Sequence, residues 1–107
     1  MYVSIRTFDL KEDKYFEGIQ WAQGMTKLFS DEFGVQAKIL TAVSGPTQRI
    51  QILSEYDSLA DFEDLMSKMF AHPRIQEFGK QRAELTVEGT STHNIIDRCN
   101  EFRTRLP

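Results

Sequence analysis

The chain has 107 residues, with 13 basic and 16 acidic side chains and a formal net charge of −3. This length fits a single domain, and eight Phe, three Tyr and one Trp are enough for a hydrophobic core, which argues against disorder. The acidic balance disfavours nucleic acid as a partner. No stretch approaches the ~18 apolar residues that a membrane span needs.

The beginning of the sequence predicts a strand rather than a targeting segment. Residues 1–10 carry Arg6 and Asp9 and lack the uninterrupted apolar run of a signal peptide. The lone Cys99 cannot form an internal disulfide, which fits a reducing compartment. We therefore expect a cytoplasmic protein with no membrane and no nucleic-acid partner. We expect one domain over residues 1–99 and a loosely ordered tail over residues 100–107.

The first predicted elements are a strand and a long helix. Residues 2–8 alternate, with Val3 and Ile5 on one side and Ser4 and Arg6 on the other. Residues 14–33 carry apolar side chains at helical spacing, and Gly34 can close that helix in the left-handed conformation. The predicted buried stripe contains Tyr15, Ile19, Ala22, Phe29 and Phe33, widened by Phe16, Met25 and Leu28, with Trp21 at its margin.

A hairpin is predicted next. Residues 35–44 and 48–56 both have strand patterns, and the turn-forming segment Gly45-Pro46-Thr47 joins them. Both faces of these strands hold apolar residues. This favours a sheet that is covered on each side.

Two helices and a final strand complete the pattern. Ser58 and Asp61 resemble a capping box at the start of a helix over residues 59–71, and Pro73 suits the start of a second piece over residues 74–82. Residues 85–89 are predicted as the fourth strand, and residues 93–98 extend it or form a short fifth. The predicted buried positions of the two helices are Phe62, Leu65, Met66, Met69, Phe70, Ile75 and Phe78.

The element order β-α-β-β-α-β predicts an α+β, ferredoxin-like fold with an antiparallel sheet. Helices would cover one face of this sheet. The other face is too apolar to stay in water, so we expect it to meet a second copy of the chain.

The chain also resembles the dimeric α+β barrel superfamily, and within it NIPSNAP-like and antibiotic-biosynthesis-monooxygenase-like domains. The resemblance covers about residues 2–96 and rests on the element order, the length, and the segments SEYDSLADFE at 54–63 and AHPRIQEF at 71–78. It implies a homodimer whose two sheets close into a barrel. It also implies a cleft between helices and sheet that takes aromatic or polyketide-like substrates, or haem.

The haem-degrading relatives combine an Asn near the first strand with a Trp and a helical His. This sequence offers Trp21 and His72, but its first strand has Ser4 and Arg6 and no Asn. We therefore expect no haem. No Gly-rich phosphate loop is present, so we predict no cofactor.

His72 and Arg6 are the predicted catalytic residues. Histidine titrates near neutrality and can move a proton, and His72 stands at a helix break where it could face the cleft. Arg6 could orient a polar substrate group. The alternatives are that His72 contacts helix-terminal carbonyls, and that Arg6 and Glu55 form an inter-strand ion pair or lie at a solvated edge.

A set of soft apolar side chains is the predicted ligand-binding surface, with core packing as the alternative. Together with Glu55 these predicted ligand-binding residues are Trp21, Met25, Phe29, Met66, Met69 and Phe70. His72, His93 and Cys99 lack paired metal-ligand spacing, so we predict no metal.

Two functions remain open from the sequence. One is a small cofactor-independent monooxygenase or isomerase that holds an aromatic substrate near His72 or Arg6. The other is a non-catalytic homodimeric module that binds a small apolar ligand or a partner.

Overall fold

The computed structural model describes residues 1–97. Arg98, Cys99 and the predicted tail over residues 100–107 lie outside the described residues. The elements follow the order β1 (Tyr2–Asp9), a short 3-10 turn η1 (Glu12–Lys14), α1 (Tyr15–Phe33), β2 (Ala37–Thr41), β3 (Arg49–Tyr56), α2 (Leu59–Phe70), α3 (Pro73–Leu85) and β4 (Thr92–Asp97).

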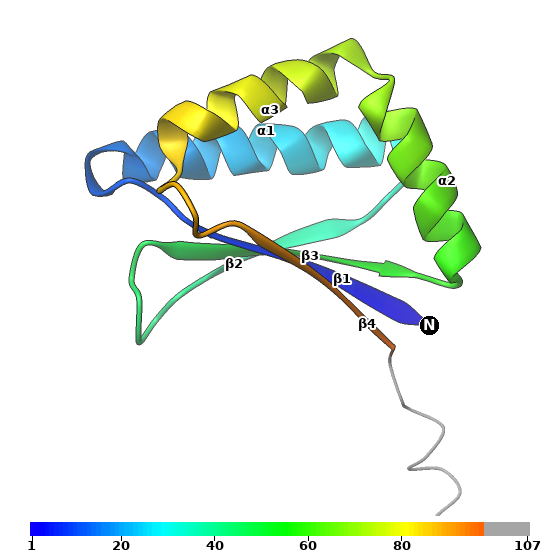
Figure 1. The fold of residues 1–107 in the computed structure, drawn as a ribbon, viewed down its shortest axis with the longest axis horizontal. Coiled ribbons are helices and arrows are strands. Elements are labelled where there is room, and N and C mark those ends of the chain that lie inside the picture. Colours follow the sequence, from blue (N-terminus) through cyan, green and yellow to red (C-terminus); the bar gives the residue numbers. More distant parts are fainter. Residues whose placement is uncertain (98–107) are drawn as a thin grey trace, which may run out of the picture.

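The four strands form one antiparallel sheet in the order β2-β3-β1-β4. All three α-helices lie on the same side of this sheet (Figure 1). This confirms the predicted α+β class and is consistent with the ferredoxin-like arrangement. None of these helices combines the length and the apolar composition that crossing a bilayer would require.

Helix α1 ends as its sequence predicts. Gly34 has φ 67°, and its N–H donates to the carbonyl of Ser30 at 3.1 Å, which closes the helix in the left-handed conformation. Two predicted positions differ from the structure. Trp21, placed at the margin of the stripe, is buried, and Phe16, placed within it, is 81% exposed. The helix is rotated so that Trp21 packs edge-on against Phe8 of β1.

The register of β1 decides which side chains face the helices. Arg6 is paired with Ile52 of β3, and Phe8 with Ile50. Directly opposed residues share a face of the sheet, and both isoleucines are buried, so Arg6 points to the helical side. The apolar pair Val3 and Ile5 therefore lies on the face that no described helix covers.

The break between α2 and α3 is held by local hydrogen bonds. The Ser58 hydroxyl accepts from the N–H of Asp61 at 3.1 Å, which confirms the predicted N-terminal cap of α2. At the start of α3, His72 Nδ1 accepts from the N–H of Arg74 at 3.2 Å, and Pro73 is the first helical residue. Phe70, predicted as buried, is 72% exposed.

The predicted fourth strand over residues 85–89 is wrong. Leu85 is the last residue of α3, and Thr86 forms a single bridge with Leu10. The Thr86 N–H and hydroxyl both donate to the carbonyl of Arg82, so the chain here is tied to the end of α3 and does not form a ladder. Val87, expected to point inward, is 43% exposed. The fourth strand is β4, which overlaps the segment 93–98 that was predicted to extend the sheet.

The core consists of two clusters under the helices. The first contains Phe8, Leu10, Trp21, Ala22, Ile50 and Ile52. The second contains Phe29, Leu65 and Met69. Met25 packs against both clusters, so it links them.

Candidate functional site

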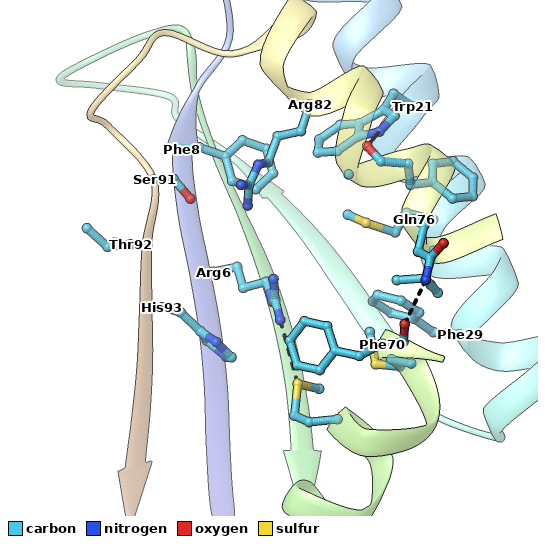
Figure 2. Close-up of a pocket in the computed structure, with 16 residues that line it drawn as sticks. Arg6, Phe8, Trp21, Phe29, Phe70, Gln76, Arg82, Ser91, Thr92 and His93 are labelled. Carbon is cyan, nitrogen blue, oxygen red and sulfur yellow. Dashed lines mark hydrogen bonds between the residues drawn. The ribbon is translucent and has the colours of Figure 1, made fainter. Parts of the chain in front are cut away.

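A cavity of about 390 Å³ lies between the sheet and the helices. Its walls come from β1, α1, α2 and α3, from the start of β4, and from Ser91 just before β4 (Figure 2). This volume is within the range of small-molecule sites in proteins. Six predicted ligand-binding residues line it, namely Trp21, Met25, Phe29, Met66, Met69 and Phe70.

The apolar part of the wall follows from helical spacing. Trp21, Met25 and Phe29 are four residues apart on α1, so their side chains form one row over the sheet. Trp21 is held in place because its indole N–H donates to the carbonyl of Phe78 in α3 at 3.1 Å. The exposed ring of Phe70 stands at the α2 end of the cavity, which Arg6 also lines (Figure 2).

The polar part of the wall is dominated by Arg6. Its side chain extends from β1 into the cavity, where Nη2 lies 3.7 Å from Sδ of Met66 (Figure 2). Burial lowers the pKa of Arg6, and the neighbouring Arg82 guanidinium lowers it further, while Tyr56 acts in the opposite direction. Arg82 comes from α3 and also lines the cavity.

His93 completes this polar side. It is paired with Arg6 in the β1–β4 register, so both side chains lie on the helical face of the sheet. Its Nε2 lies 2.7 Å from the hydroxyl oxygen of Ser4, and the tautomer of the ring decides which atom donates. Burial and then the Arg6 charge lower the pKa of His93 below its ordinary value, so the ring is neutral at pH 7.

Tyr56 is a further ionisable group near Arg6. Its hydroxyl accepts from the Ser54 hydroxyl at 3.1 Å, and its ring packs edge-on against Phe62. Burial raises the pKa of Tyr56, against the smaller effects of the Ser54 hydrogen bond and of Arg6. The phenol is therefore neutral at pH 7 and does not supply a negative charge to Arg6.

His72 lies away from this cavity. Its Nδ1 caps α3, its ring packs edge-on against Phe33, and its Nε2 is 3.9 Å from a carboxylate oxygen of Glu32. Arg6 and His72 therefore do not converge. Glu55 also lies elsewhere, since it is paired with Val3 and is exposed on the opposite face of the sheet.

His93 and Arg82 are the two ionisable residues of the cavity wall that were not predicted as site residues. His93 was considered as a metal ligand, and Arg82 as the end of a helix. The sequence signal for His93 was its place in an alternating segment, but only the pairing of β4 with β1 brings it to Arg6. Within residues 1–97, no three His, Cys, Asp or Glu side chains gather in a way that could hold a metal ion.

Solved structures of other proteins share this fold. A NIPSNAP family protein of unknown function from Agrobacterium tumefaciens has a TM-score of 0.77 and 19% identity, over 92% of this chain and 87% of that one. A candidate antibiotic biosynthesis monooxygenase from Deinococcus radiodurans has a TM-score of 0.72 and 15% identity, over 92% of each chain. Another, from Nitrosomonas europaea, has a TM-score of 0.73 and 19% identity, over 92% of this chain and 99% of that one.

No protein-family model matches the chain, and no curated protein matches its sequence. At the identities given above, the solved structures establish the fold and leave the activity open. The predicted resemblance to NIPSNAP-like and monooxygenase-like domains is confirmed as a resemblance of fold.

Proposed function

We propose that this chain, which has the α+β fold of NIPSNAP-like and monooxygenase-like proteins, is a small cofactor-independent enzyme. Its substrate is an aromatic or polyketide-like molecule held in the cavity, and its reaction is an oxygenation or an isomerisation. The observation that carries the proposal is the cavity wall, where an apolar row on α1 faces Arg6 and His93 on the sheet.

Both reactions begin with the same proton transfer. The neutral His93 ring accepts a proton from an enol or phenol of the substrate, because its lowered pKa keeps one ring nitrogen unprotonated at pH 7. The substrate oxygen becomes an anion, and the nearby Arg6 guanidinium stabilises the new charge. Ser4 holds the His93 ring in one orientation through its hydroxyl.

The anion then follows one of two routes. In an isomerisation, imidazolium returns the proton to a different atom, and the substrate formula is unchanged. In an oxygenation, a CH2 group activated by the anion reacts with O2 and becomes C=O. One oxygen atom enters the product, and the other leaves with the two hydrogens as water. The substrate supplies the electrons, so this route needs no bound cofactor.

His93 takes the role that the sequence analysis gave to His72. The reason is geometric, since His93 lines the cavity beside Arg6 and His72 caps α3. Arg6 keeps its predicted role. Glu55 is not part of the proposed site, because it lies on the other side of the sheet.

We also propose that two copies of the chain pack through the uncovered sheet face to form a barrel. Register places Val3, Ile5 and Leu53 on that face, together with Leu40 and Ile96, which are 43% and 49% exposed. Exposed apolar side chains that gather on one face of a sheet are typical of an interface. The small ligand and the homodimer are thus the two partners we expect.

The alternative is a non-catalytic module that binds a small apolar ligand or a partner. The apolar row of Trp21, Met25 and Phe29 supports it, because such a wall binds a ligand without any proton transfer. In that case neither histidine would matter for function.

Oxygen uptake with a hydroxylated anthrone tests the proposal. The native protein should accelerate conversion of the anthrone CH2 to C=O, and His93→Gln should reduce the rate about 100-fold or more. If His72→Gln lost the activity to this extent and His93→Gln kept the native rate, His72 would be the base, as predicted from the sequence. Quenching of Trp21 fluorescence without any oxygen uptake or isomerised product would favour the binding module.

A further inference from the structure

We propose that the ligand of the cavity is an aromatic carboxylic acid, whose carboxylate is held by Arg6 and Arg82. The inference rests on the proposed function, because it assigns the ligand chemistry of the same cavity. It adds a permanent negative charge to the substrate, in addition to the enol or phenol that would lose its proton to His93.

The first observation is that Arg6 lacks a carboxylate partner among residues 1–97. Its Nη2 contacts the Sδ atom of Met66, which is a weak acceptor for a guanidinium. Two other cations of the chain, by contrast, are paired with carboxylates: Arg49 Nε lies 2.9 Å from Asp9 Oδ1, and Lys68 Nζ lies 2.9 Å from Asp64 Oδ2. The cation that points into the cavity is thus left with a sulfur contact.

The second observation is that Arg82 brings another positive charge to the same space. Its guanidinium extends from α3 toward the sheet, on the same side as the end of Arg6 (Figure 2). The two charges repel each other enough to affect Arg6. No Asp or Glu is among the described residues that line the cavity. Such an uncompensated pair is unfavourable until an anion enters.

The third observation is the shape of the remaining wall. The indole of Trp21 and the rings of Phe29 and Phe70 supply flat apolar surface beside the two cations. A guanidinium presents a planar fork of N–H donors that matches the two oxygens of a carboxylate. A flat apolar body with a carboxylate at one end fits both parts of the cavity, whereas a neutral aromatic molecule would leave both arginines without a partner.

Fluorescence of Trp21, the single Trp of the chain, gives a direct measurement in the cavity wall. We would titrate the native protein with para-tert-butylbenzoate and with para-tert-butylbenzamide, which differ in charge and hardly in shape. We expect the acid to bind about tenfold more tightly or better, which corresponds to a charge-assisted contact. Inorganic phosphate is the control for an anion without an apolar body.

Two matched variants locate the charge. Arg82→Gln removes an exposed cation that lines the cavity, and Lys80→Gln removes an exposed cation of the same helix that does not. Arg82→Gln should reduce the preference for the acid about tenfold or more, while Lys80→Gln should leave it within about twofold. The affinities of the native protein for the acid and for the amide are measured without any variant. They therefore test the proposal even if a variant folds poorly.

Three results would overturn the proposal. Equal affinity for acid and amide would refute the anion site and leave the aromatic cavity of the proposed function intact. Quenching by neither compound would contradict the proposed function as well. Inorganic phosphate binding as tightly as para-tert-butylbenzoate would show that the arginines hold an anion without using the aromatic wall.

Discussion

The Ser4 hydroxyl oxygen lies 2.7 Å from Nε2 of His93, which links two residues that are 89 positions apart in the chain. Ser4 is buried, so this end of the bond is fixed by the packing of β1. The side chain of His93 is additionally bounded by the ring of Phe62, with centroids 5.6 Å apart. The bond therefore sets the orientation of the ring that we propose as the base.

The first prediction concerns the pH dependence of turnover. Because burial and Arg6 lower the pKa of His93, the ring stays neutral, and able to accept a proton, at pH values where a free histidine is already charged. We expect kcat/KM to decline as pH falls, with the midpoint of the decline below about 6.5, the ordinary pKa of histidine. A steady-state profile between pH 4.5 and pH 8, roughly the range around that value, would measure this. A midpoint above about 6.5 would contradict the assignment of His93.

The same pKa shift makes a prediction about stability. Below about pH 6.5 the unfolded chain binds a proton at His93 that the native state does not yet bind, so the free energy of unfolding falls as pH falls. Replacing His93 by Gln removes this contribution and should flatten the pH dependence in that window. Urea denaturation of both proteins at several pH values gives the comparison, and identical slopes would refute it.

Phe70 and Phe16 provide a matched test of the cavity wall. Both rings are largely exposed, Phe70 at 72% and Phe16 at 81%. Phe70 lines the cavity, whereas Phe16 is not one of the described residues that line it. Phe70→Ala should weaken binding of para-tert-butylbenzoate about fivefold to tenfold, because one aromatic contact is lost. Phe16→Ala should leave the affinity unchanged. Fluorescence titration of Trp21 measures both, and equal affinities in the two variants would argue against a bound ligand at this wall.

Two glycines in α1 should respond in opposite ways to alanine. A Cβ at Gly18 would lie 2.5 Å from Cδ2 of Leu10, and Leu10 is fully buried, so its side chain can shift only by disturbing the core around it. Gly18→Ala should therefore destabilise the protein by about 1–3 kcal/mol. A Cβ at Gly24 would make ordinary contact with Phe78 at 3.4 Å, so Gly24→Ala should stabilise the helix by about 0.5–1 kcal/mol. Urea denaturation measures both, and a shift of the same sign in both variants would be the contrary result.

Leu40 and Val43 test the proposed dimer. Leu40 lies on the uncovered sheet face, and Val43 lies in the loop after β2 with 98% of its surface exposed. Leu40→Lys should raise the dimer dissociation constant about tenfold or more, because it places a charge in the interface. Val43→Lys is the matched control. Native mass spectrometry over a dilution series measures the dissociation, and a native chain that is monomeric at all concentrations would refute the dimer.

Much of the fold could be predicted because its patterns are local. The alternation in β1, the helical spacing in α1 and the hairpin signal before β3 depend on neighbours in the sequence. The strand predicted over residues 85–89 was wrong because Leu85 and Val87 alternate with polar residues as in a strand, although Leu85 is the last residue of α3. In the structure, the N–H of Val87 donates to the carbonyl of Asp9 and the N–H of Lys11 donates to the carbonyl of Leu85, and these two bonds form one isolated bridge and not a strand.

The site was harder to predict because it depends on long-range pairing. Alternation separated Ser4 and Arg6 from Val3 and Ile5, but it could not tell which pair faces the helices. That choice is made by β3, whose Ile52 is buried opposite Arg6. The proposed change from His72 to His93 has the same origin, since only the register of β4 places His93 beside Arg6. The cytoplasmic location stays a prediction.

The strand order β2-β3-β1-β4 has a consequence during synthesis. The first strand of the chain pairs with the last described one, with Tyr2 opposite Asp97. One edge of β1 therefore stays open while the hairpin and all three helices are being made, and contacts of such large sequence separation form slowly. A partly made chain has Arg6, Trp21 and Phe29 but no His93, so the pocket becomes chemically complete only when β4 joins the sheet. Until then the growing chain offers a bare strand edge that can attract other chains.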